Sequence, residues 1–216
     1  WKDVRQVTVG SITAVRQGDY NNQWFKLAVA IVLATIPIGI AGIALSSTLN
    51  SCNSPLRGLM VIGISCLVMA VLLAAAELSA RHKRTVGEMR LRDALIVGIA
   101  QIGALIPGVS RSGSTLTAAL FLNFKREEAA RFSFLLGLPA IALAGLKELW
   151  VLFHADLPAH AWPHLIFGLV VASVSAFFAI WGLMKFLERF STWPFVIYRA
   201  VLGVFLIVAV STGLLA

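Results

Sequence analysis

One short polar stretch of the sequence contains residues whose types and spacing suit chemistry. It reads Pro-Gly-Val-Ser-Arg-Ser-Gly-Ser-Thr over residues 107–115 and lies between two apolar runs. Gly108 and Gly113 allow a tight backbone and the close approach of a ligand. Four hydroxyl residues of the kind that begin helices surround the arginine: Ser110, Ser112, Ser114 and Thr115. The stretch therefore predicts a turn that ends one helix and begins another.

The chemistry that this turn suits is the binding of a phosphate. A helix that begins here presents free amides and a partial positive charge, which favour an anion. Arg111 adds a permanent charge and a planar fork that holds phosphate oxygens two at a time. A guanidinium in hydrocarbon costs at least about 3 kcal/mol, so it is normally paired or functional. For any one hydroxyl residue alone, simple helix capping is the plainer interpretation.

Two polar residues outside the turn leave two interpretations open. Gln101 lies six residues before Pro107, where it either forms a hydrogen bond between helices or belongs to the site. Arg199 follows Tyr198 near the start of the last apolar run, where it either reaches the inner headgroups or binds the ligand.

Composition identifies the environment in which this chemistry takes place. Of the 216 residues, 59% are hydrophobic and 13% are charged, and the mean hydropathy is +0.87. Soluble domains carry about 25% charged residues, so a water-soluble globular enzyme is excluded. The net charge of +8 indicates cytoplasmic loops on anionic lipid rather than a nucleic-acid groove. Cysteine and histidine spacings match no metal motif, so no metal site is predicted.

Five apolar runs are long enough to cross about 30 Å of hydrocarbon as helices. They cover residues 27–45, 58–76, 132–153, 165–184 and 195–216. The stretch 94–124 is different, because its two apolar pieces would reach only about 21 Å and about 15 Å as helices. Two half-length helices joined by a polar turn predict a re-entrant hairpin. We therefore expect an all-α polytopic membrane protein, with a single membrane domain over 1–216.

The basic residues support an even number of passes through 94–124. With the N-terminus inside, the inner segments hold fourteen of the eighteen Lys and Arg residues. A single crossing would move the basic residues of 125–131 and 185–189 to the outside, against the usual bias. The C-terminus is then expected outside.

Three stretches together resemble the bacterial undecaprenyl-diphosphate phosphatases, the bacitracin-resistance family. Residues 107–115 are similar to the second signature of that family. Phe-Ser-Phe-Leu-Leu at 132–136, followed by Pro139, and Pro-Phe-Val-Ile-Tyr-Arg at 194–199 resemble two later stretches. The matches occur in order over roughly 94–199, whereas the first ninety residues match mainly in hydropathy.

The resemblance implies a multi-pass hydrolase of the bacterial inner membrane. It would convert undecaprenyl diphosphate into undecaprenyl phosphate, the lipid carrier for peptidoglycan and other wall polymers. The family fold is an inverted repeat of six spans and two re-entrant hairpins, with the site near the midplane and open to the periplasm. The expected partners are undecaprenyl diphosphate and membrane lipid, with no nucleic acid and with a homodimer left open.

The resemblance also implies roles for individual residues. Arg111 would bind and stabilise the diphosphate, and Ser110 and Thr115 would supply hydrogen bonds to the reacting group. The binding surface would be formed by Gly108, Ser112, Gly113, Gln101 and Arg199. No cofactor follows from the residues themselves, although the resemblance allows a divalent cation, Mg or Ca.

This sequence departs from the family pattern at one point. The first family signature, a glutamate-rich segment that ends in a Ser-Ser-Thr-Gly-His-like run, is absent from it. One hairpin and five spans equal the family architecture without its first hairpin and first span, and the chain begins with Trp1. We therefore expect a fragment that binds diphosphate weakly and hydrolyses nothing alone.

Other functions compete with this interpretation. Inverted repeats with broken helices also build transporters and flippases, in which a half-helix would bind an anionic substrate in transit. The other membrane lipid-phosphatase superfamily needs a histidine a few residues after its Ser-Arg pair, but the next histidine after Arg111 is His154. A purely structural subunit leaves the deep arginine unexplained.

Overall fold

The chain is described by a computed structural model that covers residues 2–45, 55–154 and 161–214. Within these ranges every regular element is a helix. The long helices are α2 (Gln23–Ala44), α4 (Leu59–Ser79), α7 (Arg126–Phe153), α8 (Ala161–Arg189) and α9 (Trp193–Ser211). The shorter α-helices are α1 (Lys2–Gln17), α5 (Leu91–Ala100) and α6 (Arg111–Phe121). Three short 3-10 helices complete the set: η1 (Pro55–Arg57), η2 (Val86–Glu88) and η3 (Gln101–Leu105).

Five of the described helices are long and apolar enough to cross a membrane, namely α2, α4, α7, α8 and α9. This confirms the five predicted spans and a multi-pass membrane protein. Some ends differ from the prediction: α7 already begins at Arg126, and α8 continues to Arg189. Hydropathy identifies only the part of a helix that lies in hydrocarbon, whereas the backbone hydrogen bonds continue into the polar flanks.

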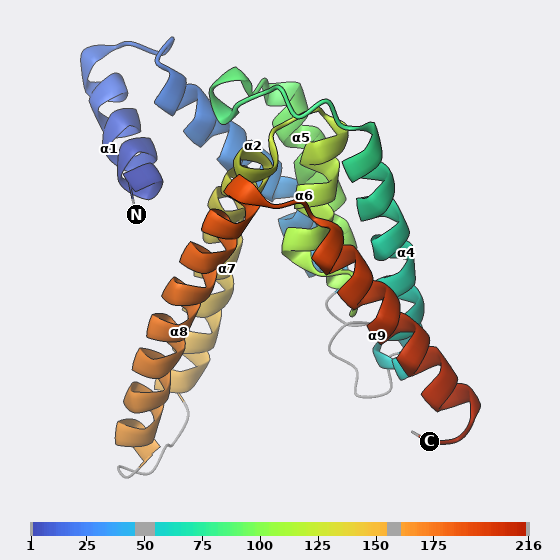
Figure 1. Cartoon of the computed structure of the whole chain (residues 1–216). Coiled ribbons are helices and arrows are strands. Elements are labelled where there is room, and N and C mark those ends of the chain that lie inside the picture. The colour runs from blue at the N-terminus through green and yellow to red at the C-terminus, as the bar shows by residue number, and fades with distance from the viewer. Residues whose placement is uncertain (1, 46–54, 155–160, 215–216) are drawn as a thin grey trace.

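The chain between α4 and α7 folds into two short helices that return to the end from which they started. The backbone N–H of Lys125 donates to the Arg84 carbonyl oxygen at 2.9 Å. The N–H groups of Lys83 and Arg84 both donate to the Asn123 carbonyl oxygen at 3.0 Å. Residues before α5 and after α6 therefore lie side by side (Figure 1). Segment 94–124 thus contains the two half-length helices that the sequence predicts.

The basic segments that were predicted inside gather at one end of the molecule, at the top of Figure 1. Asp3 of α1 forms an ion pair with Arg131 of α7. The backbone N–H of Val86 donates to a Glu128 carboxylate oxygen at 2.7 Å. Arg84 pairs with Asp93 and lies 4.4 Å above the centre of the Phe124 ring. If the chain passes through the membrane an even number of times over 94–124, the basic segments on either side of this stretch must lie at the same end of the molecule, as they do here.

The long helices form two limbs below this end (Figure 1). Helices α7 and α8 lie side by side in one limb, and α4 packs along α9 in the other. The buried core lies between α2, α4, α5, α6 and α7. Helix α8 has no buried residue in its most apolar stretch, which suits a surface that faces lipid.

Small residues bring α2 and α5 into close contact. A Cβ built on Gly98 of α5 would overlap the Ala34 carbonyl oxygen of α2 and would lie 2.8 Å from the Ala34 Cα atom. Because these are backbone atoms, they cannot move aside as a side chain can. Gly98 therefore fixes how closely α5 approaches α2.

We predict that Gly98→Ala destabilises the chain by about 1–3 kcal/mol, because it overpacks a helix contact that has no room to relax. The matched control is Gly39→Ala in α2, since a Cβ there meets nothing within 4 Å. Thermal unfolding in detergent measures both variants. Equal melting temperatures for the two variants would contradict the packing described here.

Candidate functional site

The predicted motif 107–115 lies at the turn between η3 and α6, where three long helices surround it. Gly108 has a φ of +92°, and α4 lies against it. A Cβ at Gly108 would lie 2.7 Å from the Ile62 carbonyl oxygen and 3.0 Å from the Ser65 Cβ. The Cys66 thiol donates to the Gly108 carbonyl oxygen at 3.6 Å. Both the backbone conformation and the contact therefore require glycine here.

Helix α6 begins as the hydroxyl residues predicted. Ser110 is its N-cap, with a φ of +66°, and its Oγ accepts a hydrogen bond from the Gly113 N–H at 3.3 Å. The Ser112 Oγ lies 3.5 Å from the Ser110 Oγ. Ser110 is exposed, so its hydroxyl is accessible to a ligand at the start of the helix.

Arg111 is half-buried and lies against α7. Its guanidinium occupies the space that a side chain at Gly137 would fill, because a Cβ built on Gly137 would overlap it. The Nη1 atom is buried, and no acceptor among the described residues reaches it. Gly137 therefore provides the slot in which the guanidinium lies.

Arg199 of α9 reaches the same turn from another direction. Its Nη2 donates to the Val109 carbonyl oxygen at 2.9 Å and lies 3.1 Å from where a Gly113 Cβ would be. Its Nη1 is buried and has no partner in the described ranges. The structure thus brings Arg199 to the motif, as the site interpretation of this residue requires.

The two arginines have no acidic partner in the part of the chain that the structure describes. The ion pairs found there all lie at the other end of the short helices: Arg84–Asp93, Arg126–Glu77, Arg131–Asp3 and Arg131–Glu128. A buried cation without a counter-charge is costly. The arrangement therefore suits an anion that binds between the α6 N-terminus and the two guanidiniums.

Thr115 is too buried to touch a ligand at the turn. It is 1% exposed, and its Oγ1 lies 2.5 Å from the Ser133 Oγ of α7. The same oxygen lies 2.9 Å from the Arg111 carbonyl oxygen, to which it donates. In this structure Thr115 joins α6 to α7 and holds the backbone that carries Arg111.

Gln101 is fully buried at the start of η3, and neither its Oε1 nor its Nε2 has a partner among the described residues. No described hydrogen bond joins it to the turn. One of the two interpretations of Gln101 was a hydrogen bond between helices, and the structure shows no such bond among the described residues.

Three residues that contact the turn or its neighbours were not predicted from the sequence as part of the site. Gly137 provides the slot for Arg111, Ser133 binds Thr115, and Cys66 binds the Gly108 carbonyl. The available signal for Gly137 was its position two residues before Pro139 in an apolar run, since glycine in membrane helices often permits close packing. Ser133 lies in the 132–136 stretch that carries the family resemblance, whereas nothing in the sequence marked Cys66.

The residues at the turn do not fit a divalent cation. Mg²⁺ and Ca²⁺ require carboxylate and carbonyl oxygens, whereas the turn offers two guanidiniums and hydroxyl groups. Within the described ranges, no three His, Cys, Asp or Glu residues gather into a possible metal site. His160 lies outside those ranges.

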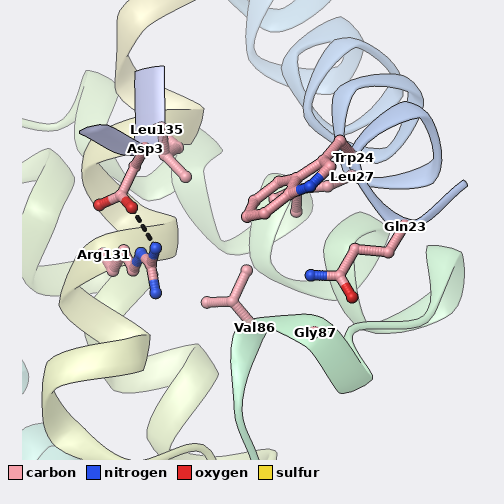
Figure 2. Close-up of a pocket in the computed structure, with 8 residues that line it drawn as sticks. All are labelled: Asp3, Gln23, Trp24, Leu27, Val86, Gly87, Arg131 and Leu135. Carbon is pink, nitrogen blue, oxygen red and sulfur yellow. Dashed lines mark hydrogen bonds and ion pairs between the residues drawn. The ribbon is translucent and has the colours of Figure 1, made fainter. Parts of the chain in front are cut away.

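A small cavity of about 40 Å³ lies elsewhere, between α1, α2, η2 and α7 (Figure 2). Asp3 and Arg131 face each other across an ion pair there, and the Gln23 amide and the Val86 side chain line the opposite side. Its charges are paired, unlike those at the turn, so we interpret it as part of the packing of α1.

Comparison with known proteins identifies the family. Residues 1–205 match the family model described as "Bacitracin resistance protein BacA". The chain belongs to the BacA family. The match extends the likeness to the first ninety residues, which in the sequence alone resembled the family mainly in hydropathy.

Similar proteins carry names that agree with this family. The chain is 68% identical to "Undecaprenyl-diphosphatase 2" of Mesorhizobium japonicum, with all of the chain and 82% of that relative aligned. It is 47% identical to "Undecaprenyl-diphosphatase" of Gloeobacter violaceus, with 100% of the chain and 74% of that protein aligned. The BacA resemblance predicted from three short stretches is therefore confirmed over nearly the whole chain.

Proposed function

We propose that the protein hydrolyses undecaprenyl diphosphate to undecaprenyl phosphate and inorganic phosphate, and so recycles the lipid carrier of wall synthesis. The observation that carries this proposal is the pair of half-buried arginines, Arg111 and Arg199, at the α6 N-terminus: the Nη1 atom of each is buried, and neither has an acidic partner among the described residues. A diphosphate supplies the negative charge that such a site lacks. The family and the names of the relatives agree with the same activity.

The geometry supports a division of labour among the residues of the turn. Arg111 binds the diphosphate and stabilises the charge that develops as the phosphoryl group leaves. Ser110 donates a hydrogen bond to the reacting phosphate from the helix N-cap. Thr115 acts through Arg111, because it holds the carbonyl of that residue and contacts no open space.

The remaining residues of the site shape and complete the binding surface. Gly108 and Gly113 let the backbone and Arg199 come close to the phosphate. Ser112 adds a hydroxyl group beside Ser110. Gln101 belongs to the proposed site through its unpartnered amide, which is fully buried and reaches a phosphate oxygen only after the turn rearranges around the ligand.

We further propose that α5 and α6 form a re-entrant hairpin whose tip lies near the middle of the bilayer and opens to the periplasm. Gly137, which contacts the tip, lies eleven residues after Arg126, or about 16 Å along α7. That is about half of the hydrocarbon thickness. The basic segments gather at the opposite, inner end.

We also propose a homodimer, in which part of the unburied apolar stretch of α8 packs against a second copy and the rest faces lipid. Mass measurement of the chain in nanodiscs would distinguish one copy from two.

Hydrolysis and transport predict different results in sealed vesicles that contain the full-length gene product. If the protein is a phosphatase, phosphate is released from undecaprenyl diphosphate on the side to which the turn opens. If it is a flippase alone, labelled lipid crosses the bilayer and no phosphate appears. Movement of lipid without phosphate release would therefore overturn the proposed function.

A further inference from the structure

Glu77 is a buried acid that lies outside the proposed site and joins three helices. It occupies the last turn of α4 and is 7% exposed. One carboxylate oxygen accepts from Arg126 of α7, from Nε at 2.7 Å and from Nη2 at 2.5 Å. The other accepts from the Thr192 hydroxyl, just before α9, at 2.9 Å. Thr192 is fully buried, so this contact is shielded from water.

The three helices that Glu77 joins are the same three that surround the turn. Helix α4 lies against Gly108, α7 provides the Gly137 slot for Arg111, and α9 carries Arg199. Elsewhere the helices diverge into two limbs (Figure 1). The Glu77 carboxylate therefore links α4, α7 and α9, the three long helices that surround the turn.

Glu77 is too far from the turn to contact a ligand there. Ser65, which contacts Gly108, lies twelve residues earlier on α4, or about 18 Å along the helix. Arg199 lies seven residues after Thr192, or about 10 Å. Any influence of Glu77 on the reaction must therefore pass along the helices.

We propose that Glu77 is a positioning residue that sets how far α7 and α9 slide along α4, and thereby places the two arginines on the diphosphate. This inference rests on the proposed function. The Arg199 Nη2 lies 2.9 Å from the Val109 oxygen, so a displacement of about 1 Å along this bond would take it beyond hydrogen-bond distance. Misplacement of that size costs about 100-fold in rate.

The test measures phosphate release from undecaprenyl diphosphate by the full-length gene product, per folded molecule and well below its melting temperature. Glu77→Ala is expected to lower kcat/KM about 10–100-fold. Thr192→Val, which keeps the Glu77–Arg126 pair and so preserves the fold better, is expected to lower it about 10-fold. Thr192→Ser restores the hydroxyl and should stay within about two-fold of the wild type. The matched control is Asp3→Asn, which removes another ion pair at the same end of the molecule and should leave kcat/KM unchanged.

A double variant separates positioning from a merely structural contribution. If Glu77 acts through Arg199, adding Thr192→Val to Arg199→Ala should reduce kcat/KM by less than about two-fold further. The positioning role would be overturned if the loss of kcat/KM in the double variant equalled the product of the losses in the two single variants. It would also be overturned if Asp3→Asn lowered kcat/KM as much as Thr192→Val does.

The outcomes also distinguish the two proposals. Suppose that the wild type releases phosphate and that Arg111→Ala abolishes the release. If Glu77→Ala and Thr192→Val then match the wild type, only the positioning role fails. If the wild type releases none, the proposed function fails and the role of Glu77 fails with it.

Discussion

Replacement of Arg111 by alanine is expected to lower kcat/KM for undecaprenyl diphosphate about 10³-fold or more in the full-length gene product. The guanidinium lies at the α6 N-terminus in the Gly137 slot, and no described acid neutralises it. Removal of a cation that stabilises a transferring phosphoryl group typically costs 10³–10⁵ in rate. Initial rates of phosphate release measure the effect.

Two further variants keep this prediction specific. Arg111→Lys retains the charge but loses the planar fork, so it should recover less than about a tenth of wild-type activity. Lys125→Ala removes an exposed cation just before α7 and should change little. Activity of Arg111→Ala above about a third of the wild type would exclude the role given to this residue.

Gly137→Ala is expected to lower kcat/KM about 100-fold with little change in melting temperature. The added methyl overlaps the Arg111 guanidinium, which is the far end of a flexible side chain. The arginine can therefore move aside, and the fold survives while the charge leaves its place. Steady-state kinetics and thermal unfolding of the same preparation measure the two quantities.

Gly145→Ala provides the matched control on the same helix, because a Cβ there meets nothing within 4 Å. It should keep wild-type kinetics and gain slightly in stability, since alanine favours a helix over glycine. If both glycine variants lose activity equally, the effect belongs to α7 as a whole and the slot is not the cause.

Much of the architecture could be predicted from the sequence because membrane spans depend on composition. Each span needs about 20 apolar residues, and α4 and α9 satisfy that condition without reference to any neighbour. The turn was predictable for a similar reason. Glycine tolerates positive φ and serine favours the N-cap, and the structure gives Gly108 a positive φ and makes Ser110 the N-cap. The positive φ of Ser110 itself does not follow from its residue type.

The surroundings of the turn could not be predicted, because they depend on which helices meet. Gly137 and Ser133 are ordinary residues of an apolar helix until α6 packs against them. The burial of Thr115 also results from the packing of α6 against α7. Because Thr115 is buried, it supports the backbone of Arg111 and does not contact the phosphate directly. The partners of Glu77 likewise depend on which helices meet, because Arg126 belongs to α7 and Thr192 lies just before α9.

The central claim is that Arg111 and Arg199 together bind a lipid-linked diphosphate, and its most direct test is a binding measurement. The 216-residue chain in nanodiscs is titrated with radiolabelled undecaprenyl diphosphate. We predict weak, saturable binding that inorganic pyrophosphate displaces and that the double variant Arg111→Glu, Arg199→Glu abolishes. Binding by the double variant as tight as that of the wild type, or wild-type binding no greater than that of empty nanodiscs, would contradict it.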